Sequence, residues 1–188
     1  ASYPITVIFM AFAVGSNLGA SVVVSRLFGA RDIGKMKSAV YTAFIACGLM
    51  SLILTVLGYV YCGSMMRLIH TPSNIFGDGE LYLKIYVFGL TFLFLYNVCT
   101  GIFTALGDSK TPLYFLIGSS IGNILLDYWF VAKFHWGVAG VAWATFIAQG
   151  ISAGLALVTL SLRLKGIKTS RRVVLFDLLL LSQIAAIA

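Results

Sequence analysis

Residues 111–133 read TPLYFLIGSSIGNILLDYWFVAK, an apolar run long enough to cross a membrane as one helix. Asp127 is the only Asp, Glu, Lys or Arg between Lys110 and Lys133, and Asn123 precedes it by one helical turn. A carboxylate within hydrocarbon is costly, so it normally faces a protein interior or a wet cavity and marks an ion or proton path. We therefore take Asp127 as the candidate functional residue around which the rest of the chain is organised.

The composition is that of an integral membrane protein. Of the 188 residues, 60% are hydrophobic and 10% are charged, against roughly 25% charged in a typical soluble domain, and the mean hydropathy is +1.00. A membrane β-barrel would need short strands of alternating polarity, which these solid apolar runs do not provide. Further charge-free runs, each long enough to cross about 30 Å of hydrocarbon as a helix, cover residues 1–25, 38–66, 85–107 and 136–162.

The sequence thus predicts an all-α, polytopic helix bundle with about five transmembrane helices. The expected spans cover residues 3–25, 38–62, 81–106, 113–132 and 138–162. A short interfacial helix is expected before Pro72. The small-xxx-small spacing of Gly15, Ser16, Gly19 and Ala20 is expected to admit a close neighbouring helix. Because the chain starts and stops inside apolar segments, we expect it to be a piece of a longer protein.

The net charge of +7 comes from basic residues at the helix ends and does not indicate nucleic-acid binding. Ten Lys and Arg residues lie on one side of the expected spans and three on the other. The positive-inside rule then places the loops 26–37 and 107–112 and the tail after residue 162 in the cytoplasm. The compact loops fit a multi-pass protein of a cell (inner) membrane, whose partner is the lipid bilayer.

The sequence does not indicate a metal centre or an enzyme active site. Cys47, Cys62 and Cys99 lie in or beside apolar segments without metal-like or disulfide-like spacing, so they are interpreted as small buried hydrophobes. An intramembrane aspartyl protease needs two carboxylates that share a site, and this sequence supplies one. No enzymatic activity and no resident cofactor are expected.

Oxygen-bearing side chains are predicted to converge near the outer end of the bundle. Asp127 lies six residues before Lys133, roughly 9 Å below the outer boundary, and Thr145 lies five residues after Gly140, roughly 8 Å below it. Neighbouring antiparallel helices bring these depths together, with Asn123 one turn deeper. A carboxylate, an amide and a hydroxyl suit a small hard cation such as Na⁺, and a desolvated carboxylate also holds a proton.

Polar residues in this region also have a structural interpretation. Asp127 could act only as polar glue between helices, although an amide or hydroxyl would do so at a lower desolvation cost. Asn97 and Gln149 are further candidates for lining the cavity. Each is equally well explained by an interhelical hydrogen bond.

Four motifs stand out in the sequence: SRLFGARD (25–32), ALGDSKTP (105–112), NILLD (123–127) and GVAGVAWAT (137–145). Together they resemble the multidrug and toxic compound extrusion (MATE) transporters, in the branch typified by the DNA-damage-inducible protein F-like members. The resemblance implies a twelve-helix protein with two six-helix lobes. Residues 1–162 would then be helices two to six of the N-terminal lobe, and residues 163–188 a basic, amphipathic cytoplasmic linker towards a C-terminal lobe outside this chain.

The resemblance also implies a function. Asn123, Asp127 and Thr145 match the cation site of the N-terminal lobe in that branch, which uses a further Asp on helix one, a helix that this chain lacks. The implied activity is H⁺- or Na⁺-coupled antiport by alternating access, exporting cationic amphiphilic drugs or toxic organic compounds. One alternative is a lipid-linked oligosaccharide flippase of the same superfamily, which favours basic cavity residues, whereas the buried ionisable residue here is acidic. The other is a non-transporting membrane scaffold.

Overall fold

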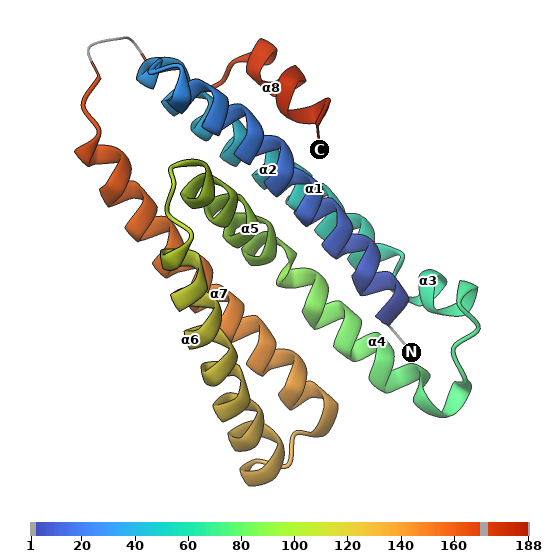
Figure 1. The fold of residues 1–188 in the computed structure, drawn as a ribbon. Coiled ribbons are helices and arrows are strands. Elements are labelled where there is room, and N and C mark those ends of the chain that lie inside the picture. Colours follow the sequence, from blue (N-terminus) through green and yellow to red (C-terminus); the bar gives the residue numbers. More distant parts are fainter. Residues whose placement is uncertain (1–2, 170–172, 188) are drawn as a thin grey trace.

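The computed structural model describes residues 3–169 and 173–187, and that part of the chain folds into helices without strands (Figure 1). The prediction of an all-α protein is therefore confirmed. In chain order the elements are α1 (Tyr3–Gly29), α2 (Ile33–Val60), α3 (Cys62–Leu68), α4 (Ser73–Phe88), α5 (Leu90–Ala105), α6 (Lys110–Asp127), the π-helical segment η1 (Tyr128–Lys133), α7 (Gly137–Gly166) and α8 (Leu178–Ala185).

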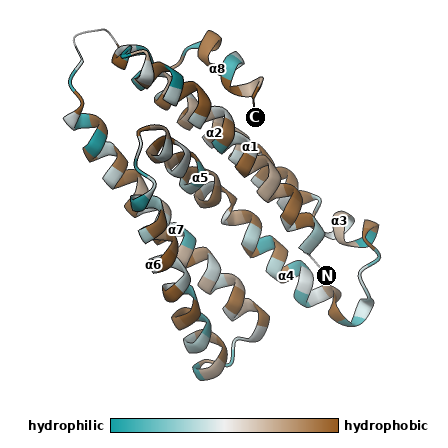
Figure 2. Cartoon of the chain, in the orientation of Figure 1, coloured by the Kyte–Doolittle hydropathy of each residue, from teal (hydrophilic) through white to brown (hydrophobic). Residues whose placement is uncertain are grey.

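The predicted number of about five membrane spans is also confirmed. Helices α1, α2 and α7, and α6 continued by η1, are each long and apolar enough to cross a bilayer. Helices α4 and α5 meet at a bend of 47° and supply the fifth span when they are counted together. Hydrophobic residues cover most of the length of these helices in Figure 2.

The third span differs from the prediction of one straight helix over residues 81–106. It begins at Ser73, directly after Pro72, and is interrupted at Gly89. The N–H of Gly89 is shared between the carbonyls of Ile85 (3.3 Å) and Tyr86 (2.9 Å). Glycine is a weak helix former and a common site of sharp kinks, so the axis changes direction here. The short helix expected before Pro72 is present as α3.

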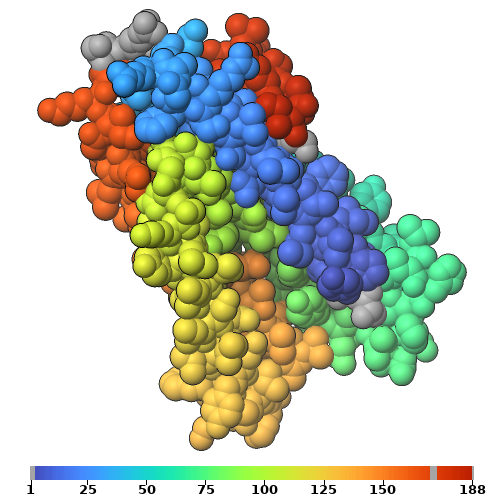
Figure 3. Space-filling view, viewed as in Figure 1, coloured from blue at the N-terminus to red at the C-terminus, as the bar shows by residue number. Residues whose placement is uncertain are grey.

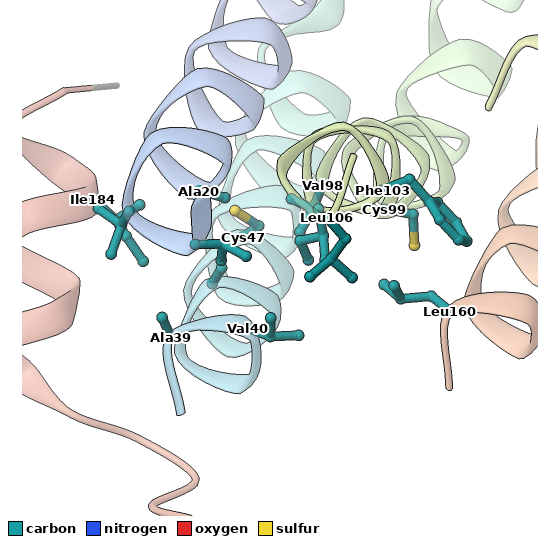
Figure 4. Packing of buried hydrophobic residues seen from close by; sticks show 14 of the residues in the cluster. Ala20, Ala39, Val40, Cys47, Val98, Cys99, Phe103, Leu106, Leu160 and Ile184 are labelled. Atoms are coloured by element: carbon teal, nitrogen blue, oxygen red, sulfur yellow. The ribbon is translucent and has the colours of Figure 1, made fainter. Parts of the chain in front are cut away.

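The main core lies where α1, α2 and α5 meet, and α7 and α8 add side chains to its edge (Figure 4). Phe103 of α5 and Leu160 of α7 are both fully buried there. A second cluster joins α1, α3 and α4 towards the other end of the bundle. The free cysteines Cys47, Cys62 and Cys99 are all buried in these clusters, as the sequence predicted.

The predicted small-residue face of α1 is a packing surface. Ser16, Gly19 and Ala20 are buried, and α1 packs closely against α5. The approach is tight at Gly101, where an added Cβ would lie 2.2 Å from Asn17 Oδ1 and 2.8 Å from the Asn17 carbonyl oxygen. Close packing through small residues replaces the hydrophobic driving force that helices lack within a bilayer.

The C-terminal segment folds back onto the start of α2. Helix α7 continues four residues past the expected end of the last span. The backbone N–H of Val174 donates to Ser38 Oγ (2.8 Å) and that of Asp177 to Thr42 Oγ1 (3.1 Å), and α8 packs against α1 and α2. Part of the predicted basic tail, residues 170–172, lies outside the described residues. The linker role of residues 163–188 stays a prediction.

Helix α6 lies at the edge of the bundle and packs mainly against α7. Of its residues, all of which are described, only Pro112 is buried. In the space-filling view the yellow atoms of α6 project away from the blue atoms of α1 (Figure 3). The helix that carries the candidate functional residue is thus the least enclosed of the spans.

Candidate cation site

The start of α6 is fixed at a carboxylate that caps it. Asp108 accepts hydrogen bonds from the Thr111 N–H (3.1 Å) and the Thr111 hydroxyl (2.8 Å), and it also forms an ion pair with Arg163 at the end of α7. The hydrogen bonds from Thr111, with a smaller contribution from Arg163, lower the pKa of Asp108 below its ordinary value. These contacts hold the α5–α6 turn against α7.

Asn123 and Asp127 lie on the same face at the end of α6, one helical turn apart. Asn123 Nδ2 and Asp127 Oδ1 are both shielded from solvent, and neither has a hydrogen-bond partner among the described residues. Buried polar atoms are nearly always paired, so two orphans on one helical face require an explanation. A ligand that both atoms would contact is one such explanation.

The helix changes type immediately after Asp127. Residues 128–133 form the π-helical segment η1, in which the Phe134 N–H donates to the Trp129 carbonyl, five residues back, at 3.1 Å. Such π-turns are rare and occur often at functional sites. The sequence predicted an ordinary helix to residue 132 and did not indicate this segment. Trp129 and Trp136 are exposed at this end of the bundle.

Thr145 lies on α7, which runs antiparallel to α6 and packs against it (Figure 1). Its hydroxyl donates to the Val141 carbonyl (3.0 Å). No hydrogen bond joins Thr145 to Asn123 or Asp127 in the described structure. Because a hydroxyl that donates one bond still has lone pairs to offer, Thr145 Oγ1 remains available as a ligand. Its predicted role stays a prediction.

Asn97 and Gln149, the two further candidates for lining the cavity, make different contacts. Asn97 Nδ2 donates to the Leu93 carbonyl on its own helix at 2.8 Å, so this amide does not bridge two helices. Gln149 lies beside the break between α4 and α5, since a Cβ on Gly89 would be 3.3 Å from Gln149 Oε1. Gln149 thus lies close to another span, and neither residue has an assigned role.

Helix α4 contributes a residue that the sequence analysis did not single out. Tyr82 interacts electrostatically with Asp127, and its ring stacks on that of Tyr86 with a centroid distance of 6.2 Å. Two tyrosines four residues apart on an apolar helix were the available signal, because they share one face. The phenol of Tyr82, on a third span, is thus within range of the charge of Asp127.

The side chains near Asp127 that could bind a cation offer hard oxygen ligands. Over residues 3–169 and 173–187 no three His, Cys, Asp or Glu side chains gather into a group that would hold a metal ion. Carboxylate, amide, hydroxyl and phenol oxygens suit an alkali cation or a proton, whereas transition metals favour imidazole and thiolate ligands.

Comparison with known proteins gives consistent matches. The family model described as MatE matches residues 1–129. Two proteins of Bacillus subtilis (strain 168) are similar: the probable multidrug resistance protein YpnP, 32% identical over 151 residues, and the probable multidrug resistance protein YoeA, 31% identical over 150 residues. The matches cover 80% and 78% of this chain but 34% and 32% of those proteins, so the chain spans about a third of their length.

A solved structure extends the match to nearly the whole chain. The crystal structure of MATE in the bent conformation superposes with a TM-score of 0.88. The match covers 99% of this chain and 42% of the solved chain, at 22% sequence identity. At that identity the likeness concerns the fold.

Proposed function

Because the chain belongs to the MatE family, we propose that it is part of a multi-pass membrane transporter that exports small organic molecules by cation-coupled antiport. The relatives named above are described as probable multidrug resistance proteins. An acidic rather than basic residue in the span favours cationic, amphiphilic substrates over the lipid-linked oligosaccharides of a flippase.

The observation that supports this proposal is the pair of orphaned polar atoms on α6, Asn123 Nδ2 and Asp127 Oδ1. A half-turn of the Asn123 amide exchanges its donor for the carbonyl oxygen, which then faces the same space as the carboxylate. Bound Na⁺ would take these oxygens and that of Thr145 as ligands, whereas a proton would bind Asp127 itself. Either cation removes the cost of a buried, unpaired negative charge.

Coupling follows when cation and substrate favour different conformations of the transporter. Transporters of this kind bind ions and substrates near discontinuous helices between two repeats. The 47° bend between α4 and α5, with Gln149 of α7 at the break, is a discontinuity of this kind. We assign the substrate chamber to the interface of the lobe formed by residues 1–162 with a C-terminal lobe reached through residues 163–188.

We further propose that this protein lies in the cell (inner) membrane with residues 26–37, 107–112 and the tail after 162 in the cytoplasm. Ten of the thirteen Lys and Arg residues belong to these segments. In Figure 1 the α1–α2 connection, the start of α8 and the end of α7 lie at one end of the bundle, and the η1–α7 connection lies at the other.

The test is Asp127→Asn in the full-length protein, assayed by efflux of a fluorescent cationic dye from vesicles under imposed pH and Na⁺ gradients. We expect normal insertion with efflux reduced to background under both gradients. Asp78→Asn is the matched control, because Asp78 is an exposed carboxylate of α4, and its efflux should match the wild type. Unchanged coupled efflux in Asp127→Asn would overturn the proposal and make Asp127 a structural residue.

A further inference from the structure

A groove between α2 and α7 ends close to the α1–α2 connection, with a volume of about 470 Å³. On the α2 side it is lined by Lys37, Val40, Tyr41 and Phe44, whose spacing of three and four residues places them on one helical face. Leu95 of α5 lines it between the two walls. We call this pocket the basic groove.

The α7 side mirrors the α2 side. Leu157, Ser161 and Lys165 follow each other at intervals of four residues, and the buried side chains of Leu160 and Leu164 complete the wall. Each wall therefore has a lysine at the same end of the bundle. From each lysine the lining residues continue for seven or eight residues, roughly 10–12 Å along the helix axis, and apart from Tyr41 and Ser161 they are apolar.

The residues that line the basic groove include two lysines and no carboxylate. The ion pairs found in the described part of the chain, Glu80 with Lys84 and Asp108 with Arg163, involve neither Lys37 nor Lys165. The hydroxyl of Ser161 forms no hydrogen bond with a described residue and can donate one.

We propose that the basic groove binds an anionic phospholipid of the cytoplasmic leaflet. The phosphate would lie between Lys37 and Lys165, with hydroxyl donors from Tyr41 and Ser161, and an acyl chain would follow the apolar walls. Basic pockets between transmembrane helices on the cytoplasmic side attract anionic headgroups. A peptide would need polar partners along its length, but beyond Tyr41 and Ser161 the walls of the groove are apolar. The leaflet assignment rests on the orientation proposed above.

The other end of the same helices provides an internal contrast. A pocket of about 650 Å³ there is lined by the aromatic rings of Tyr59, Phe88 and Trp143 and by Lys84. Lys84 Nζ lies 2.8 Å from Glu80 Oε1 and 5.8 Å from the centre of the Tyr59 ring. Because this ammonium group is already paired, we expect no preference for anionic lipid at that end.

The experiment titrates the delipidated full-length protein with phosphatidylglycerol or phosphatidylcholine of identical acyl chains and counts bound lipids by native mass spectrometry. The wild type should bind phosphatidylglycerol more tightly. Lys37→Gln and Lys165→Gln should each weaken that binding about fivefold, and the double variant about 30-fold. Binding of phosphatidylcholine should not change.

Lys35→Gln and Lys168→Gln are matched controls, because both lysines lie near the same end of the bundle but neither lines the basic groove. They should leave binding of both lipids essentially unchanged, whereas Ser161→Trp, which fills the groove, should weaken both. Equal binding of the two lipids by the wild type, or equal losses in the controls, would overturn the proposal. Asp127→Asn should keep the lipid preference, so a failed transport hypothesis is distinguishable from a failed lipid site.

Discussion

Helices α1 and α5 touch through small residues, whereas α6 rests on α7 at the edge of the bundle with few buried side chains. Nine residues of α1 are buried, but among the residues of α6, all described, only Pro112 is. At Gly101 there is no room for one additional carbon atom, while at Gly118 of α6 an added Cβ would meet nothing within 4 Å.

The polar pair lies in the loosely packed region. Asn123 and Asp127 are on α6, next to the π-helical segment, and the tightly packed helices carry self-satisfied polar groups such as Asn97. Regions that change conformation belong to the less stable parts of a protein. We infer that α1, α2 and α5 form the scaffold and that α6 carries the proposed coupling residues, so substitutions in the scaffold should affect stability and substitutions of the polar pair on α6 should affect transport.

The largest effect on stability is expected for Gly101→Ala. The new methyl group would meet the Asn17 side-chain oxygen at 2.2 Å and its carbonyl oxygen at 2.8 Å. The side chain can rotate but the carbonyl cannot, so α1 and α5 must separate. Overpacking of this kind costs about 1–3 kcal/mol, measured as a lower midpoint of thermal unfolding in detergent.

Gly118→Ala is the control, because the same change is made where nothing stands within 4 Å. Its midpoint should stay the same or rise, since alanine favours helix over glycine. Equal destabilisation by the two substitutions would contradict the contrast between the packed scaffold and α6.

The next largest effect is an increase in stability, expected for a substitution of Asp127. Asp127→Leu replaces a carboxylate that has a buried, unpartnered oxygen, and we expect it to stabilise the protein by about 1 kcal/mol while abolishing efflux. The measurement pairs the unfolding midpoint with the dye assay. Asn97→Leu is the control, because its amide already bonds the Leu93 carbonyl, and it should not stabilise. A lower midpoint for Asp127→Leu would instead support the interpretation of Asp127 as polar glue.

Much of the fold could be predicted from the sequence because long apolar runs in a bilayer have one stable local structure, the helix. The small residues around Gly19 also indicated the packing face of α1. The bend at Gly89 and the early start of α4 at Ser73 could not be predicted in this way. Both depend on which backbone groups contact neighbouring helices, and such contacts cannot be predicted from the hydropathy of the sequence.

The candidate site was predicted as far as residue type and depth allow. Asp127 and Asn123 were indicated by their position within an apolar run, and the structure adds that one polar atom of each is buried without a partner. Tyr82 was not predicted, because it comes from a helix whose direction depends on the bend. The π-helical turn after Asp127 was also not predicted, since it is a choice between hydrogen-bond registers that differ little in energy.

The smallest effect is expected at the contact that joins the two regions, between Asp108 at the α5–α6 turn and Arg163 of α7. Asp108→Asn keeps the capping oxygen but loses the charge, and a cap or a surface ion pair contributes about 1 kcal/mol or less. We expect a slightly lower unfolding midpoint at neutral pH. Asp78→Asn, at an exposed carboxylate on α4, is the control and should leave the midpoint unchanged.

The pH dependence separates this contact from simple packing. The pKa of Asp108 is lowered in the folded state, mainly by the hydrogen bonds from Thr111, so its stabilising contribution is fully present above the ordinary value of 3.8. That contribution is lost as the pH falls through the lowered folded-state value. The unfolding midpoints of wild type and Asp108→Asn should therefore converge in acid. A constant difference would mean that the charge of Asp108 does not hold α6 to α7, and that packing against α7 alone positions the helix bearing Asp127.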